Sequence, residues 1–275
     1  MFATRFAPSP TGYLHRGHAF SALTAHAAAT AASGRFVLRI EDIDTTRSRP
    51  AFESAIYEDL AWLGLTWETP VRRQSEHLAD YHAALAQLEA HGLVYRCFRT
   101  RREVAEAMAS APHGPMEVFR GGPLRSEEET ARLAAGEPFA WRLSLDAAAA
   151  AVGGFDSLTF VEEGQGVIPA RPELGGDVVL ARRDVGVAYH LAVTVDDALQ
   201  GITHVIRGRD LFEATHVQRL LQALLHLPEP TYRHHDLLLG PDGRRFAKRD
   251  RSETLRSLRE RGMTPADLRK ELGFG

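Results

Sequence analysis

The chain has 275 residues, of which 44% are hydrophobic and 25% are charged, and it carries a formal net charge of −3. This length suits one large α/β domain or two smaller units, and the slightly negative charge disfavours a protein that depends on non-specific DNA contacts, which require a basic excess. Cys97 is the only cysteine and no secretory signal or membrane-spanning apolar run is recognisable, so we expect a cytoplasmic protein without internal disulfides or a membrane partner.

The N-terminal part of the sequence alternates strand-like and helix-like segments. Short apolar runs are followed by longer stretches that end at glycine, the residue favoured just past the C-terminus of a helix. Strands that alternate with helices in this way predict a parallel sheet with helices on both faces. The predicted elements are a strand at 2–7, a helix at 17–33 that stops at Gly34, a strand at 35–40, a helix that starts at Pro50 and ends at Gly64, and a helix capped by Ser75 that ends at Gly92.

The middle of the chain, residues 100–185, has a different pattern. Two capping-box pairs flank a connector rich in proline and glycine, and two short alternating runs follow them. This pattern favours an inserted α+β unit with an antiparallel patch, packed on the parallel sheet. The capping pairs are Thr100 with Glu103 and Ser126 with Glu129, the connector spans 110–123, and the alternating runs span 139–145 and 158–164.

After the insertion the buried-strand character returns. The sequence contains no internal repeat and no low-complexity tail, so a single α/β fold with an insertion is the predicted architecture. We predict buried strands at 186–199 and 202–208, a helix at 213–227, a final strand at 231–239 and two short helices at the end of the chain.

The first candidate site is the stretch "RFAPSPTGYLHRGH" at 5–18. A strand leads into a loop, and His15 and His18 lie three residues apart at a helix start, where this spacing places both imidazoles on one face. The helix N-terminus attracts anions, and Gly17 lets a nucleotide approach the backbone. The stretch has neither the dinucleotide-binding glycine pattern nor a P-loop, so phosphate would be bound by side chains. Two alternatives stay open: a chance pair among 13 histidines, and a metal site that would need further ligands.

Lys248 is the second candidate, because lysine is rare in this chain. Of 33 Lys and Arg residues only Lys248 and Lys270 are lysines, so a lysine within the arginine-rich stretch 244–251 indicates a need for a compact, mobile ammonium group. Such a group suits the binding of a moving phosphate. The alternative is an ordinary surface lysine on a turn.

Together these segments resemble the class I glutamyl-tRNA synthetases. "RFAPSPTGYLHRGHAFSAL" followed by "LRIEDIDTTR" is similar to their N-terminal region, with His15 to His18 in the place of their "HIGH" signature. "RRFAKR" at 244–249 takes the place of their "KMSKS" signature, with Lys248 on its second lysine. The chain ends soon after this signature, where those enzymes continue into a long anticodon-binding region. It therefore resembles the shorter glutamyl-Q tRNA(Asp) synthetases, and the similarity extends from about residue 2 to residue 250.

The resemblance implies a Rossmann-like catalytic domain and a two-step reaction. Members of that family use ATP and Mg²⁺ to activate glutamate without tRNA, and then place it on the queuosine base at the first anticodon position of tRNA(Asp). We expect the halves of the catalytic domain at 1–99 and 186–230, an acceptor-type insertion at 100–185 and a C-terminal segment at 231–275. The implied catalytic residues are His15, His18 and Lys248, which with Gly17 also bind ATP, and the implied glutamate-binding residues are Arg5, Ser9, Glu41, Tyr189 and Arg207.

The residue types agree with these implied roles. Arginines such as Arg5 and Arg207 can bind carboxylates through two parallel hydrogen bonds, and a carboxylate at the end of a strand, Glu41, can bind an ammonium group. The hydroxyls of Ser9 and Tyr189 can orient the substrate. Two alternatives stay open: Arg5 and Glu41 can form a structural ion pair, and Tyr189 can belong to the core.

No metal site is predicted. Many members of the family carry zinc in the insertion, but Cys97 has no second cysteine to accompany it, so that zinc site is lost and Cys97 is expected to be a buried apolar residue. Asp42 and Asp44 in "EDID" are a weak metal pattern; we predict that Asp44 caps a turn, and assign neither to a metal. The second signature also departs from the family, with Arg245, Ala247 and Arg249 at positions of lysine, serine and serine.

Other functions are compatible with parts of this pattern. A small-molecule nucleotidylyltransferase would share the two histidines but would not explain the arginines and the tyrosine around an amino acid. A truncated glutamyl-tRNA synthetase that charges tRNA(Glu), or a remnant that only binds RNA, would keep some of the motifs. The predicted partners are L-glutamate, ATP and queuosine-containing tRNA(Asp); we predict a monomer, and the arginines at 99–102 are candidates for tRNA contact.

Overall fold

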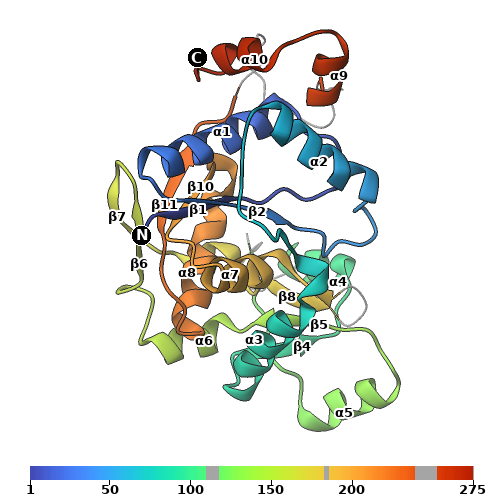
Figure 1. The fold of residues 1–275 in the computed structure, drawn as a ribbon. Coiled ribbons are helices and arrows are strands. Elements are labelled where there is room, and N and C mark those ends of the chain that lie inside the picture. Colours follow the sequence, from blue (N-terminus) through green and yellow to red (C-terminus); the bar gives the residue numbers. More distant parts are fainter. Residues whose placement is uncertain (110–117, 183–185, 239–252, 275) are drawn as a thin grey trace.

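The computed structural model describes residues 1–109, 118–182, 186–238 and 253–274. The centre of the molecule is a set of parallel-paired strands: β1 (Ala3–Phe6), β2 (Arg35–Ile40), β3 (Arg72–Arg73), β10 (His204–Gly208) and β11 (Thr231–His235). Figure 1 labels all of them except the short β3. Strand β1 pairs with β2 and β2 with β3, while β10 pairs with β11. The two groups join where the N–H of Thr203 donates to the carbonyl oxygen of Ala3 at 2.9 Å, so the strands lie in the order β3-β2-β1-β10-β11.

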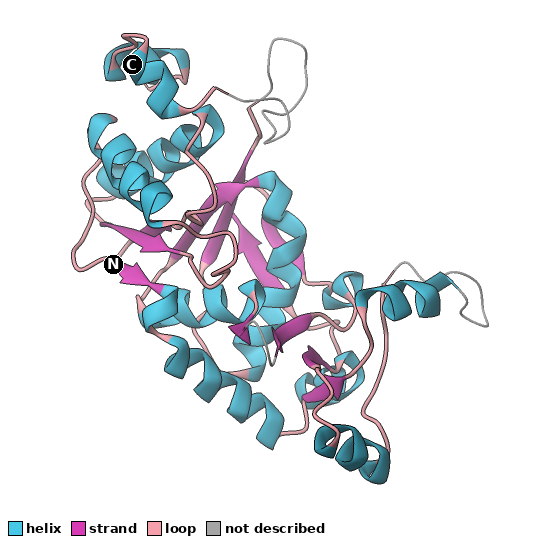
Figure 2. Cartoon of the chain, turned by 90° about the vertical axis from the view of Figure 1, so that its right-hand side faces the viewer, coloured by secondary structure: helices cyan, strands magenta, loops and turns pink. Residues whose placement is uncertain are grey.

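Helices cover both faces of this sheet. They are α1 (Arg16–Ala31) and α2 (Pro50–Trp62) on one face, and α3 (Leu78–Ala90), α7 (Tyr189–Leu199) and α8 (Phe212–Leu224) on the other (Figures 1 and 2). Two clusters of buried apolar side chains match the two faces. One includes Leu23 and Leu60, and the other includes Leu191 and Leu221. The predicted α/β fold with a parallel sheet covered on both sides is therefore confirmed.

The middle of the chain adds two antiparallel units. The first is the sheet formed by β4 (Val94–Cys97), β5 (Ala140–Leu143), β8 (Val179–Arg182) and β9 (Gly186–Val187), accompanied by α4 (Arg101–Ala109), α5 (Ser126–Ala134) and α6 (Leu145–Val152). The second is the hairpin of β6 (Thr159–Glu162) and β7 (Gly166–Pro169). Strand β6 also pairs in parallel with β11, so the hairpin extends the central sheet. The antiparallel patch is present as predicted, while the boundaries of the inserted unit stay a prediction.

Two short helices end the chain, as predicted from the sequence. They are α9 (Leu255–Glu260) and α10 (Pro265–Glu271), which lie beside α1 and α2 in Figure 1. Leu255 and Leu268 are fully buried and belong to the same apolar cluster as Leu14 at the start of α1. The C-terminal helices are therefore part of the apolar core on this face of the sheet. Within the described ranges, no helix has both the length and the apolar character needed to cross a membrane.

The predicted strand at 186–199 is wrong, because most of this segment is helix α7. Its residues from Leu191 to Asp197 are all buried. A helix enclosed on every side has no polar face, and its apolar run then lacks the period of an amphipathic helix. The many β-branched residues strengthened the false impression of a strand.

The predicted role of Gly34 as the cap of α1 is also wrong. Ser33 takes the left-handed conformation with φ of 48°, and Gly34 follows it. Gly34 is needed for a different reason: a Cβ at this position would lie 2.5 Å from the carbonyl oxygen of Phe2. The close approach of the first strand therefore excludes any side chain there.

Of the three helix N-termini for which a side-chain cap was predicted, one has that cap. Thr100 and Glu103 form the expected reciprocal pair at the start of α4. Ser75 lies instead in a short 3₁₀ turn ahead of α3, where its N–H and hydroxyl both donate to Asp42. Ser126 is already the first residue of α5, and no side chain caps that helix.

Asp59 gives rise to a prediction about stability. Its carboxylate is buried in α2, neither oxygen accepts a hydrogen bond from the described residues, and the guanidinium of Arg259 is 3.7 Å away. Burial raises the pKa of Asp59 to about 6, and the charge of Arg259 only partly offsets this effect. Because the folded-state pKa lies above the unfolded value of about 3.9, the free energy of unfolding falls as pH rises between these two values and stays low above them.

We therefore expect Asp59→Asn to raise the free energy of unfolding at pH 8 by about 2 kcal/mol and to change it little near pH 3. Chemical unfolding of both proteins at the two pH values measures this. Glu58→Gln is the control, since Glu58 is the exposed neighbour that also contacts Arg259. A variant that is less stable than the wild type at pH 8 would contradict the account.

Candidate functional site

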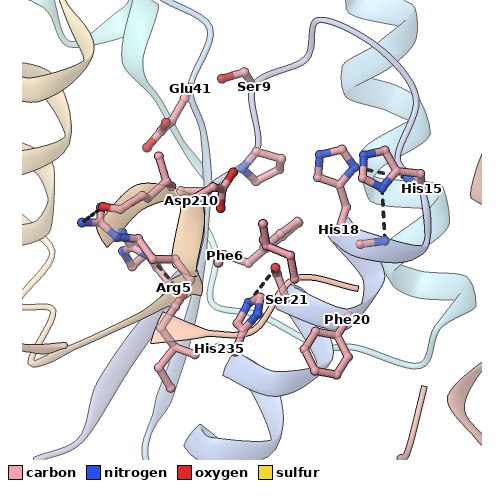
Figure 3. Close-up of a pocket in the computed structure, with 18 of the residues that line it drawn as sticks. Arg5, Phe6, Ser9, His15, His18, Phe20, Ser21, Glu41, Asp210 and His235 are labelled. Carbon is pink, nitrogen blue, oxygen red and sulfur yellow. Dashed lines mark hydrogen bonds between the residues drawn. The ribbon is translucent and has the colours of Figure 1, made fainter. Parts of the chain in front are cut away.

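The carboxyl ends of β1, β2 and β10 open into a cavity of about 540 Å³, shown in Figure 3. In parallel α/β sheets this is the edge where ligands bind. Lys248, one of the residues predicted from the sequence, lies outside the described residues. The other predicted site residues all line this cavity: Arg5, Ser9, His15, Gly17, His18, Glu41, Tyr189 and Arg207.

His15 and His18 cap the N-terminus of α1 with their own rings. Nδ1 of His15 accepts the N–H of Gly17 at 3.1 Å, and Nδ1 of His18 accepts the N–H of His15 at 3.2 Å. The ring centroids are 3.8 Å apart. Because each Nδ1 accepts a hydrogen bond, the proton of the neutral imidazole is on Nε2 in both rings. The pair thus offers Nε2–H donors at the positive end of a helix, which suits an anion such as phosphate.

Gly17 has a packing role that the sequence did not reveal. A Cβ at this position would lie 3.0 Å from Cε1 and 3.1 Å from Nδ1 of His15. A side chain here would therefore press on the ring that caps the helix. The absence of a side chain preserves the geometry of the histidine pair, in addition to any space that it leaves for a ligand.

Arg16 links the histidine turn to the end of the chain. Its Nε donates to Glu271 at 2.7 Å, and its Nη1 donates to Glu253. Glu253 is the first described residue after 239–252, the range that contains Lys248. The chain therefore returns to the histidine turn immediately after this range. Sequence analysis did not single out Arg16, because nothing in its spacing distinguishes it from a solvated arginine.

On the side of Arg5 and Glu41, the cavity rests on a buried ionic network. Arg5 pairs with Asp197 at 3.1 Å, and Glu41 pairs with Arg39 at 3.1 Å. Arg39 also contacts Asp197 at 2.7 Å and Asp196 at 3.5 Å. The sequence left open an ion pair between Arg5 and Glu41; in the structure each of them pairs with a different residue of this network. Burial raises the pKa of Glu41, and the charges of Arg39 and Arg5 oppose that rise.

Arg207 is buried as well, but its hydrogen-bond partners are neutral. Its Nε donates to the ring of His234 at 3.1 Å, and its Nη2 donates to the hydroxyl of Thr215 at 2.8 Å and to the carbonyl of Leu211 at 3.1 Å. Its Nη1 donates to the hydroxyl of Tyr189 at 3.4 Å. Among the described residues no carboxylate forms an ion pair with it. A buried guanidinium held in this way is suited to bind an anion.

Tyr189 and Ser9 occupy the wall and the rim of the same cavity. Tyr189 begins α7, is only half-buried and turns its hydroxyl to Arg207, so it is more than a core residue. Ser9 is exposed in the loop after β1. Figure 3 shows the rings of His15 and His18 on one side of the cavity, and Arg5 with Glu41 on the other. The arrangement can hold two ligand groups of different charge next to each other.

Asp42 and Asp44, the two aspartates of the "EDID" stretch, have structural roles. Asp42 accepts the hydrogen bonds of Ser75, and Asp44 closes a turn by accepting the N–H and hydroxyl of Thr46, as predicted. The hydrogen bonds from Thr46 and Arg47 lower the pKa of Asp44 to about 2. Over the ranges that the structure describes, no three His, Cys, Asp or Glu side chains are placed to hold a metal ion.

Cys97 is buried beside Tyr95 and Phe119, which confirms the expectation of a small apolar residue. In the same region, Asp177 accepts hydrogen bonds from the hydroxyl of Tyr95 at 2.9 Å and from the N–H of Gly121 at 2.7 Å. These contacts, together with apolar packing, hold this part of the insertion.

The α/β fold carries a strand-end cavity beside a histidine-capped helix, and comparison with known proteins identifies the family. Residues 1–273 match the family described as tRNA synthetases class I (E and Q), catalytic domain. The chain belongs to this family.

Its relatives include two proteins named glutamyl-Q tRNA(Asp) synthetase. The protein from Rhodobacter capsulatus is 48% identical, with 98% of this chain and 99% of that protein covered. The protein from Symbiobacterium thermophilum is 41% identical, with 100% of this chain and 86% of that protein covered. The solved structure of the glutamate tRNA ligase of Elizabethkingia meningosepticum, in complex with its amino acid, is similar, with a TM-score of 0.76 and 28% sequence identity. The match covers 95% of this chain and 53% of that chain.

The buried network yields a prediction. Asp197 is shared by Arg5 and Arg39, so Asp197→Asn would leave two buried guanidinium groups without this charge and should lower the free energy of unfolding by about 3–5 kcal/mol. Asp80→Asn is the matched control, because Asp80 is the more exposed partner of Arg72 at the edge of the same network; we expect a loss below about 1 kcal/mol. Urea unfolding of the two variants measures both effects. Equal losses would contradict the central place of Asp197.

Proposed function

We propose that this protein uses ATP to activate L-glutamate as glutamyl-adenylate without tRNA, and then transfers the glutamyl group to the queuosine base of tRNA(Asp). One observation carries the proposal: a single cavity combines Nε2–H donors at a helix N-terminus with a buried arginine, Arg207, whose hydrogen-bond partners among the described residues are all neutral. The first group suits a triphosphate and the second suits an acidic side chain. The names of the relatives from Rhodobacter capsulatus and Symbiobacterium thermophilum support the same substrates.

In this proposal Arg207 binds the side-chain carboxylate of glutamate. Arg5 is already paired with Asp197, whereas Arg207 makes no ion pair with the described residues. A substrate carboxylate would give Arg207 its counter-charge, and the amide of glutamine would not. A buried group left unpaired by the wrong substrate can discriminate by several orders of magnitude without editing. Glu41 is suited to bind the α-ammonium group, and the hydroxyls of Ser9 and Tyr189 to orient the molecule.

The chemistry of the first step is an in-line displacement. An oxygen of the α-carboxylate forms a bond to the α-phosphorus of ATP, and the bond from that phosphorus to the bridging oxygen of pyrophosphate breaks. His15 and His18 would donate their Nε2 protons in hydrogen bonds to phosphate oxygens, and the resemblance assigns Lys248 the same task. Mg²⁺ would arrive with ATP as part of the substrate, because the described residues form no cage for it and this ion is commonly bound through phosphates.

In the second step a hydroxyl of the tRNA nucleoside attacks the acyl carbon and AMP leaves. The cavity is open, so a nucleoside can approach the adenylate from the side of Ser9 and Tyr189. A second cavity of about 390 Å³ lies there, and Ser9, Glu41 and Tyr189 line both cavities. A small-molecule nucleotidylyltransferase would need the histidine pair but not Arg207, Tyr189 and Glu41 in one cavity. That alternative is not favoured.

Exchange of radioactive pyrophosphate into ATP tests the first step. We expect the wild type to catalyse glutamate-dependent exchange without tRNA, and Arg207→Gln to lower kcat/KM for glutamate on the order of 100-fold, because a charged hydrogen-bond donor is lost. Arg209→Gln is the control, since Arg209 is exposed and contacts only Asp236 among the carboxylates of the described residues; its effect should stay within about twofold. A wild type without glutamate-dependent exchange would exclude this activity.

The acceptor needs a separate measurement. We expect [¹⁴C]glutamate to be transferred to queuosine-containing tRNA(Asp), and neither to tRNA(Asp) that lacks queuosine nor to tRNA(Glu). The reason is chemical, because only the queuosine base offers the additional hydroxyls that would attack the adenylate. Filter-bound radioactivity with the three purified tRNAs distinguishes the cases. Equal labelling of both tRNA(Asp) preparations, or labelling of tRNA(Glu) alone, would show that the acceptor has been wrongly assigned.

A further inference from the structure

Arg207 is the first member of a hydrogen-bonded chain that crosses three neighbouring strands. Its Nε donates to Nε2 of His234 at 3.1 Å, and Nδ1 of His234 is 2.8 Å from Oε2 of Glu162. The second carboxylate oxygen of Glu162 accepts the backbone N–H of His234 at 2.7 Å. The three residues lie on β10, β11 and β6, and all three are buried. None of the roles described above uses His234 or Glu162.

The donors and acceptors of this chain allow one arrangement of protons. A guanidinium cannot accept a hydrogen bond, so Nε2 of His234 must be unprotonated; an ionised carboxylate cannot donate, so Nδ1 must carry the proton. The hydroxyl of Thr215 fits the same arrangement, because it accepts from Nη2 of Arg207 and lies 3.3 Å from Nε2 of His234, to which it can donate. Burial, followed by the charges of Arg207 and Arg5, lowers the pKa of His234 to about 3, so the ring is neutral.

The neutral ring keeps a negative charge away from Arg207. Without it, the carboxylate of Glu162 would be the natural partner of the guanidinium and would compete with any carboxylate on the substrate. With the imidazole between them, Glu162 fixes the ring, and the ring fixes Arg207 through an uncharged acceptor. Nε and Nη2 of Arg207 are then occupied by neutral groups, and the hydrogen bond that Nη1 makes within the described part of the chain is a long one, to Tyr189 at 3.4 Å. Nη1 is the part of the group best placed to bind a ligand.

We propose that His234 and Glu162 are positioning residues that set the selectivity of this site for an acidic amino acid. They hold Arg207 in place without neutralising it directly, so that the side-chain carboxylate of the substrate supplies the missing charge. This inference rests on the proposed function and specifies which residues produce its preference for glutamate over glutamine. It concerns side chains that act through Arg207 and do not touch the substrate.

Glu162→Gln is the sharpest test, because it changes the direction of the hydrogen bonds with little change in shape. The amide oxygen must face the backbone N–H of His234, so the amide N–H₂ faces Nδ1. His234 then has to carry its proton on Nε2, which points a donor at Nε of Arg207. We expect KM for glutamate to rise about tenfold or more, and the preference for glutamate over glutamine in pyrophosphate exchange to fall by at least about tenfold, with kcat at saturating glutamate within about threefold of the wild type.

Two further variants separate positioning from general stability. His234→Gln offers a neutral acceptor to Arg207 and should keep more of the preference than His234→Leu, which offers none. Gln222→Leu is the matched control: Gln222 is buried and donates to Tyr232, a neighbour of His234 on β11, at 2.8 Å. It should lower the melting temperature and leave the preference within about twofold of the wild type.

Nitrogen NMR of protein labelled at histidine gives a readout that is independent of activity. We expect the wild type to show His234 protonated on Nδ1 alone, and Glu162→Gln to show it protonated on Nε2, with His234→Leu identifying the resonances. A wild type without glutamate-dependent exchange would overturn the proposed function, and the tautomer of His234 could still be measured by NMR. An active wild type, together with unchanged preference in Glu162→Gln or a His234 proton on Nε2, would overturn the positioning role.

Discussion

The arrangement of the cavity depends on one fully buried guanidinium, that of Arg39. It lies in β2 and contacts Glu41, which follows the last residue of that strand, and Asp196 and Asp197 on α7. Burial alone would lower the pKa of Arg39, but the charges of Asp197, Glu41 and Asp196 raise it, so the group stays charged. Because a buried charge is costly unless it is paired, this network holds the sheet and the helix in one register. The same contacts fix Glu41 directly and Arg5 through Asp197.

The side of the cavity formed by His15 and His18 is built on a different principle. His15 and His18 are held by backbone N–H groups at the start of a helix, and the turn is tied to the C-terminal helices by Arg16. The partners of Arg16, Glu253 and Glu271, are partly exposed. Since salt weakens exposed ion pairs more than buried ones, the two sides respond differently to ionic strength. The side of Arg5 and Glu41 is held by buried ion pairs, whereas the side of His15 and His18 depends on a helix end and surface charges.

The sequence could reveal the residues that face the cavity, but not the residues that hold them. His15 and His18 were found because a motif places them at a loop-to-helix boundary, where spacing alone limits the geometry. Asp197 was hidden within 186–199, which was predicted as a strand because a fully enclosed helix has no amphipathic period. Arg39 gave a weak hint, since an arginine inside an apolar strand needs a buried partner. Partners distant in sequence follow only from the packing of α7 on the sheet.

The contrast between the two cavity arginines explains how one residue type can serve two purposes. Arg5 has its own carboxylate, Asp197, so its charge is largely balanced before any ligand arrives. Arg207 is linked to the carboxylate of Glu162 only indirectly, because the neutral ring of His234 lies between them. A negatively charged ligand therefore gains little binding free energy by displacing the partner of Arg5, and much by pairing with Arg207. Under the proposed function, the selectivity of the cavity thus depends less on which charged residues line it than on which of them lack a direct counter-charge among the described residues.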